Sequence, residues 1–128
     1  MLSGPSSELD DAADYFAQSL VIDREVQDRQ GEGVVLSSLG QIALSRGRLD
    51  EAEHYFRECL AVMEEVQDAL NEATIAVILG EFLITLRNNR EEGCPLIQRA
   101  IQIRQDLELP GVEEAMETAQ RFGSISST

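Results

Sequence analysis

The sequence of 128 residues contains no lysine and no tryptophan, and it has only one histidine and two cysteines. Its ten basic residues are therefore all arginines, and with 24 aspartates and glutamates they give a formal net charge of −14. A surface this acidic repels phosphate backbones, so we expect no direct nucleic-acid partner. The excess of acid either keeps the helix faces soluble or attracts a basic partner.

The residue types that carry catalysis or bind metals are scarce and scattered. Cys59 and Cys94 do not stand in a metal-ligand spacing, and two cysteines do not make a disulfide framework. His54 lies between Glu53 and Tyr55 on the polar side of its predicted helix, where a solvated side chain is expected. The sequence has no glycine-rich phosphate loop and no His/Cys/Asp ligand spacing. We therefore expect no enzyme activity, no cofactor and no metal.

Long apolar segments and targeting signals are also lacking. No uninterrupted apolar run reaches the roughly eighteen residues that a membrane-spanning helix needs, so no membrane insertion is predicted. The N-terminus lacks the basic start and apolar core of a signal peptide. These features predict a cytoplasmic protein.

The sequence does contain a repeat of forty residues. When residues 9–40 are aligned with residues 49–80, 13 of 32 pairs are identical, where average residue usage would give about two. The identical pairs include Tyr15 with Tyr55, Phe16 with Phe56, and Gly40 with Gly80. A period of this size predicts stacked helical units rather than one closed core.

Apolar residues recur at the helical period throughout the repeat. They predict helices over 8–27, 32–46, 49–67 and 70–86, and a short helix over 112–121. A further helix is predicted to begin at 92–94, because Pro95 is tolerated only in the first turn of a helix. Gly40 and Gly80 fall in mid-helix, where glycine costs about 1 kcal/mol, so we expect close approach of a neighbouring helix there. Gly47 is predicted to end its helix in the left-handed conformation, and Asp50 to cap the next helix.

The predicted organisation is a repeat domain over residues 8–122 between a disordered leader, 1–7, and a disordered tail, 123–128. Within the domain we expect a half repeat over 8–28, repeats over 32–68 and 70–108, and a capping helix over 112–122.

The middle repeat resembles the tetratricopeptide repeat. The pattern that carries the resemblance is Leu36-x-x-Leu39-Gly40, then Gly47, then Ala52-x-x-Tyr55-Phe56-x-x-Cys59-Leu60. The extended turns at 26–28 and 66–68 look like the longer, forty-residue form found in polarity adaptors and in sensor arms of bacterial regulators. The resemblance covers about residues 9–108. It implies an all-α solenoid of antiparallel helix pairs, with about six helices and a right-handed superhelix.

The resemblance also implies a non-catalytic scaffold that binds a protein or peptide in a concave groove lined by the first helix of each repeat. The matching positions here are Val34, Ser37, Ser38, Gln41, Leu44, Ser45, Thr74, Val77, Ile78, Glu81, Ile84 and Thr85. Leu44, Val77 and Ile84 fit the core equally well. Two alternatives stay open: a ligand-sensing regulatory arm of a larger system, and a purely self-assembling structural module.

The predicted groove indicates which partner chemistry it favours. Some members of the family hold a peptide carboxylate with asparagine and basic side chains, and the matching positions here are Ser38, Ser45, Ile78 and Thr85, none of them basic. Glu81 adds negative charge. We therefore expect a partner segment with apolar anchors and arginine or lysine alongside, and no capture of acidic C-termini.

The first predicted helix carries an apolar stripe, and the helix that would cover part of it is absent. The stripe consists of Leu9, Ala12, Phe16 and Leu20. A bare stripe usually finds a partner. It predicts a homodimer through the N-terminal helix, unless the chain is a piece of a longer protein.

Overall fold

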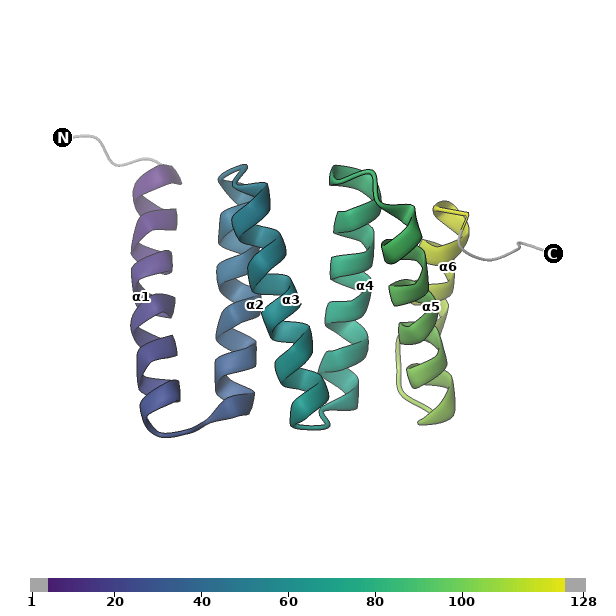
Figure 1. The fold of residues 1–128 in the computed structure, drawn as a ribbon, viewed down its shortest axis with the longest axis horizontal. Helices are drawn as coiled ribbons and strands as arrows, with labels where there is room; N and C mark the ends of the chain where they lie inside the picture. Colours follow the sequence, from purple (N-terminus) through teal and green to yellow (C-terminus); the bar gives the residue numbers. More distant parts are fainter. Residues whose placement is uncertain (1–4, 124–128) are drawn as a thin grey trace. The chain divides into compact units, whose positions relative to one another are not determined.

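The structure is a computed structural model that describes residues 5–123, and within that range it contains six α-helices and no strand (Figure 1). The helices are α1 (Pro5–Glu25), α2 (Arg29–Ser45), α3 (Leu49–Glu65), α4 (Ala69–Leu86), α5 (Arg90–Asp106) and α6 (Val112–Arg121). The prediction of an all-α fold with six helices is confirmed. The handedness of a superhelix stays a prediction.

The chain divides into two compact units, and the boundary in the sequence lies between Val66 and Gln67. In the first unit α2 packs against both α1 and α3, and in the second α5 packs against both α4 and α6. Figure 1 shows that consecutive helices in each unit run in opposite directions. Each unit therefore has one helix that packs against the other two.

Each turn between consecutive helices contains a residue with positive φ, which ends the preceding helix in the left-handed conformation. These residues are Gln27 (φ 61°), Gly47 (73°), Gln67 (59°), Asn88 (53°) and Glu108 (54°). After Gly47, the amide of Arg48 donates to the carbonyl of Ala43 at 2.9 Å, which satisfies one of the orphan carbonyls of α2. The prediction at Gly47 is confirmed, whereas the two glutamines were not anticipated because glutamine has no special preference for this conformation.

The first helix begins earlier than its sequence predicts. α1 starts at Pro5, so residues 5–7 of the predicted disordered leader are helical. Proline is well suited to the first helical position because its missing N–H would have no partner there. Gly123 follows α6 in a turn with φ 72°. The rest of the predicted leader and tail, residues 1–4 and 124–128, lies outside the described residues.

The start of α5 contradicts the prediction that Pro95 delays it. The side chain of Asn89 accepts a hydrogen bond from the amide of Glu92 at 3.1 Å, so α5 begins at Arg90 and Pro95 lies in its second turn. An N-terminal cap and a buried face together outweigh the one hydrogen bond that proline removes.

The start of α3 also differs from its prediction. Its N-cap residue is Arg48, with no side-chain cap, and Asp50 lies within the first turn. The capping box predicted at Asp50 is therefore wrong. The carboxylate of Asp50 still stands near the positive end of the helix dipole.

Mid-helix glycines allow the close helix approach that the repeat predicts. A Cβ added to Gly40 would lie 2.6 Å from the ring of Phe56 on α3. A Cβ added to Gly80 would lie 2.8 Å from the carbonyl oxygen of Gly93 on α5. Neither site has space for a methyl group, so the prediction for both glycines is confirmed.

By length and composition alone, α4 is apolar enough to cross a membrane, with a mean hydropathy of 1.6 over its 18 residues. The helix meets this criterion despite Glu72 and Glu81, which interrupt its apolar run. A core helix meets the same criterion, and the side of α4 that contains Leu79 and Leu83 is buried. The prediction of no membrane insertion stays a prediction.

Two of the three glycines of α2, Gly33 and Gly40, provide a matched test of helix packing. We expect Gly40→Ala to lower the free energy of unfolding by about 1–3 kcal/mol, because the new methyl group would overlap the rigid ring of Phe56. Gly33→Ala should cost less than Gly40→Ala, because the atom that its methyl group meets first, at 2.7 Å, is the flexible end of Met63, and the stiffer Cγ1 of Val62 lies farther away, at 3.0 Å. Urea unfolding followed by circular dichroism measures both, and equal losses would refute this account.

Candidate functional site

The predicted groove positions of the first unit form an accessible face on α2. Val34, Gln41 and Ser45 are exposed, whereas Ser37, Ser38 and Leu44 are half-buried. The opposite face of the helix is buried and consists of Val35, Leu36, Leu39, Gly40 and Ala43. Both faces follow the helical period, so burial of one leaves the other available to a partner.

The predicted positions on α4 are less uniform. Thr74 and Thr85 are exposed, and Val77, Ile78 and Glu81 are half-buried. Ile84 is only 7% exposed, and a Cβ added to Gly93 would lie 2.7 Å from it. Ile84 is therefore a core residue and not a groove residue, which decides the alternative that its spacing left open.

Three of the α4 positions, Thr74, Val77 and Ile78, line a pocket of about 390 Å³ within the second unit. The rest of its wall comes from the end of α5, the loop that follows it, and α6: Arg104, Pro110, Gly111, Glu114, Ala115 and Thr118. This volume lies within the range of small-ligand pockets. The second unit therefore contains a concave site, part of which the sequence predicts.

Arg104 is the residue of this pocket that sequence reasoning missed. Its Nη2 donates to the hydroxyl of Thr74 at 3.0 Å, and its Nη1 donates to the carbonyl oxygen of Pro110. Gly111, at φ 92°, packs so closely that an added Cβ would lie 2.7 Å from Nη1. The available signal was weak: Arg104 is the basic residue in the last turn of α5.

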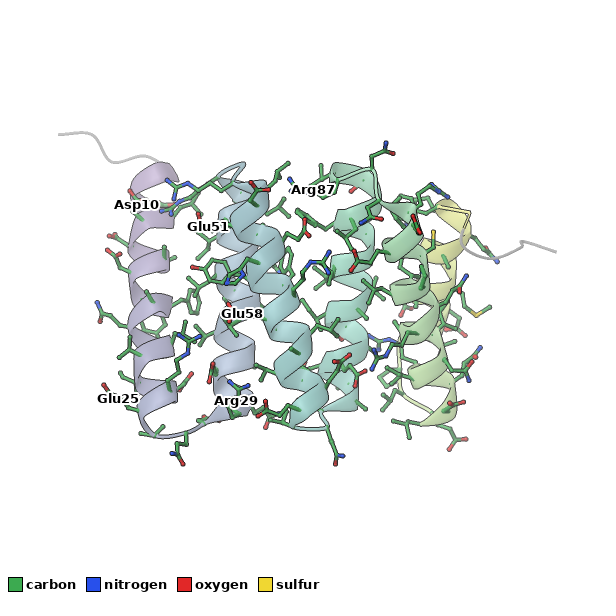
Figure 2. The ribbon with its side chains drawn as sticks, viewed as in Figure 1. Asp10, Glu25, Arg29, Glu51, Glu58 and Arg87 are labelled. Carbon is green, nitrogen blue, oxygen red and sulfur yellow. The ribbon has the colours of Figure 1, made fainter. Side chains whose placement is uncertain are left out.

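A charged network joins the three helices of the first unit at one end. Glu32 on α2 is 5% exposed, and its carboxylate accepts from Arg24 on α1 at 3.0 Å and pairs with Arg29 at 2.9 Å. Arg29, which is labelled in Figure 2, also donates two hydrogen bonds of 2.9 and 2.7 Å to the carboxylate of Glu65 on α3. At the other end of α1, Asp10 pairs with Arg46. These pairs fix α1 and α3 against α2.

The network shifts the titration of its members. Burial disfavours the charged form of Glu32, but the hydrogen bonds from Arg29 and Arg24 outweigh that effect and hold its pKa below the ordinary value. The hydrogen bond from Arg29 likewise lowers the pKa of Glu65, and the two carboxylates together raise the pKa of Arg29. The negative charges of Glu32 and Glu65 are therefore retained in moderately acidic solution.

The predicted self-association stripe lies in a different environment from the one expected. Its four residues, Leu9, Ala12, Phe16 and Leu20, are all half-buried. The exposed apolar residues of α1 are Tyr15 (66%), Val21 (56%), Ile22 (56%) and Val26 (67%). Tyr15 stacks edge-on against Phe16 with ring centroids 5.3 Å apart. The accessible apolar face of α1 is thus offset from the predicted stripe.

The histidine and the buried cysteine, which are the residues most often used in catalysis, have environments that suit a structural role. His54 is an exposed side chain that pairs with Glu58 across one turn of α3, with 2.9 Å between Nε2 and Oε1. Burial raises the pKa of the Cys59 thiol to about 11, so it is protonated and unreactive at neutral pH. Among residues 5–123, no cluster of three or more His, Cys, Asp or Glu side chains could hold a metal ion.

A family model described as tetratricopeptide repeat matches residues 6–65, which span the helices α1 to α3 of the first unit. No curated protein matches the chain.

The buried carboxylate of Glu32 predicts a pH-dependent contribution to stability. Because its folded pKa is depressed, the stabilisation is present above about pH 4.5 and is lost as the pH falls through the lower folded value. We expect Glu32→Gln to cost about 1–3 kcal/mol of unfolding free energy at pH 7, and the difference from wild type to shrink below pH 4.

Glu51→Gln is the matched control for this test. Glu51 is an exposed residue of α3, 3.8 Å from Arg48 (Figure 2), and its loss should change the unfolding free energy by less than about 0.5 kcal/mol. Thermal or urea unfolding at several pH values measures both variants. A cost for Glu32→Gln that does not vary with pH would contradict the assignment.

Proposed function

We propose that this chain, whose residues 6–65 match the tetratricopeptide repeat model, is a non-catalytic module that binds a segment of a partner protein. Repeats of this family generally mediate protein–protein interaction. The observation that carries the proposal is the accessible face of α2, where the apolar side chains of Val34 and Leu44 alternate with the hydroxyl and amide groups of Ser37, Ser38 and Gln41. Such a face has apolar anchor points and donors between them, but no nucleophile–base pair.

The charge of the chain supports a partner segment that combines apolar anchors with arginine or lysine. The net charge is −14, and several arginines already pair with carboxylates of this chain, as Arg24 and Arg29 do with Glu32. The second unit has Glu81 on α4, 3.9 Å from Arg121 of α6. Basic side chains on the partner would be steered toward these acidic surfaces, and salt would weaken the interaction.

Substitution at the exposed centre of the α2 face tests this proposal. We expect Val34→Asp to weaken the binding of arginine-containing apolar peptides, selected on a peptide array, by about tenfold, because the anchor becomes a charge that must be desolvated. Ala61→Asp, at an exposed position of α3, should leave binding unchanged. Fluorescence titration at low and moderate salt measures both. An array with no retained segment, or equal effects of the two variants, would contradict the proposal.

Self-association through α1 is a second candidate function, favoured by the forty-residue repeat. Ile22 on α1 is equivalent to Val62 on α3, and Val62 is 3% exposed, close to Gly33 of α2. Ile22 is 56% exposed. The face of α1 that includes Ile22 therefore corresponds to a face that a helix covers on α3, and a helix of a second copy could cover it.

Light scattering tests this candidate with two neighbouring residues of equal exposure. If the face of α1 that includes Tyr15, Ile22 and Val26 joins two copies, Ile22→Glu should convert a dimer to a monomer at tens of micromolar, because two buried carboxylates would face each other. Val21→Glu, on another side of the helix, should leave the dimer intact. A wild-type monomer at these concentrations would refute self-association.

A further inference from the structure

We propose that the exposed side of α1 is a second interaction surface, which binds an arginine-bearing helix of a partner protein in the way that α3 binds α2. The forty-residue repeat relates each residue of α1 to one of α3. On α3 the corresponding side is covered by α2. The contacts between α2 and α3 therefore show what a helix on α1 has to provide. This surface is separate from the accessible face of α2, so the two can be disrupted one at a time.

The residues on this side of α1 match those of α3 in type but not in burial. Tyr15 is 66% exposed, whereas the identical Tyr55 on α3 is half-buried. Ile22 is 56% exposed, whereas Val62 at the equivalent position is 3% exposed. Large apolar side chains that are exposed on one repeat and covered on the other indicate a surface that a partner covers.

The negative charge at the end of α3 is also repeated on α1. Glu65 of α3 accepts two hydrogen bonds of 2.9 and 2.7 Å from Arg29 of α2. Its counterpart Glu25, labelled at the C-terminal end of α1 in Figure 2, is exposed, and its carboxylate has no hydrogen bond or ion pair within residues 5–123. An arginine in the first turn of an incoming helix could bind Glu25 as Arg29 binds Glu65.

The glycines of α2 define the shape of the incoming helix. A Cβ added to Gly33 would lie 3.0 Å from Val62, and one added to Gly40 would lie 2.6 Å from Phe56. These glycines follow Arg29 by four and eleven residues. A helix that runs antiparallel to α1 therefore needs an arginine in its first turn and glycine or alanine four and eleven residues later. Larger side chains at these two positions would hold it away from α1.

The charge of the chain favours a partner protein over a second copy as the occupant. α1 contains six acidic residues and one arginine, and the whole chain has a net charge of −14. A second copy brings the same charge, and its own α2 already has the required side packed against α3. Arginines or lysines on the flanks of a partner helix would be attracted to α1 instead. The occupant is therefore a basic helix of another protein.

A peptide of residues 28–46 is the first probe of this surface, because it contains Arg29, both glycines and the N-cap Asp28. When it is added to the full chain, we expect it to shift the amide NMR signals of Tyr15 and Ile22. The Arg29→Glu peptide should bind about tenfold more weakly, because its glutamate would face Glu25.

The second probe places the same helix within the chain, because a free helix of this length is marginal in water. Residues 28–48 replace residues 1–8, so that the added helix leads into α1 as α2 leads into α3. We expect the midpoint of urea unfolding to rise by about 1 M, because the added helix covers exposed apolar surface. The same variant with Arg29→Glu and Gly33→Leu in the added copy alone should show no rise.

Two variants of α1 locate the effect. Ile22→Glu should abolish the signal shifts and the rise in midpoint, whereas Val21→Glu should preserve both, because its counterpart on α3, Ala61, is exposed. Circular dichroism checks that each variant folds. If the peptide is too weakly helical to bind, the lengthened chain decides.

Three results would overturn the proposal. The first is an added helix that leaves the midpoint unchanged, and the second is an equal effect of the altered and unaltered probes. The third is a wild-type dimer that Ile22→Glu converts to a monomer, because a second copy would then occupy the surface.

Discussion

Close contact between paired helices at glycine is the constraint on which both units depend. In the first unit the ring of Phe56 occupies the space where Gly40 has no side chain, and in the second the backbones of Gly80 and Gly93 approach directly. Such contacts fix the rotation of each helix about its own axis. Once α2 and α4 are fixed in this way, the residues on their opposite faces are the ones left for a partner. The accessible face is thus a consequence of how the core packs.

The close helix contact at glycine is made by different atoms in the two units, although their sequences repeat. In the first unit, α3 places the large ring of Phe56 against Gly40. In the second unit, α5 places a second glycine, Gly93, and the smaller side chain of Ile97 against Gly80. Because Ile97 is smaller than Phe56, α4 and α5 can approach until the backbone atoms of Gly80 and Gly93 are in contact. Ile84 then enters the core. Equivalent positions in two repeats therefore do not guarantee equivalent exposure.

Arginine links the helices in a chain that has no lysine. Arg24 and Arg29 meet at Glu32, and Arg99 reaches Glu72, the counterpart of Glu32 in the next repeat. The planar guanidinium can hold two carboxylates at once, which an ammonium group does less well. Because these arginines are paired with carboxylates and acidic residues outnumber basic ones, the unpaired carboxylates make the surface negatively charged. Arg104 differs because its partners are neutral.

The sequence by itself determined the helical class, the forty-residue period, the close approach at Gly40 and Gly80, and the left-handed turn at Gly47. These follow from patterns within one helix or one turn, which short-range spacing can express. Only the tertiary structure decided that Ile84 is core, that α5 begins ahead of Pro95, and that Arg104 meets Thr74, thirty residues away in the sequence. Helical periodicity assigns a residue to a face of its own helix. It contains no information on which residue faces it from another helix, because that depends on how closely the two helices pack.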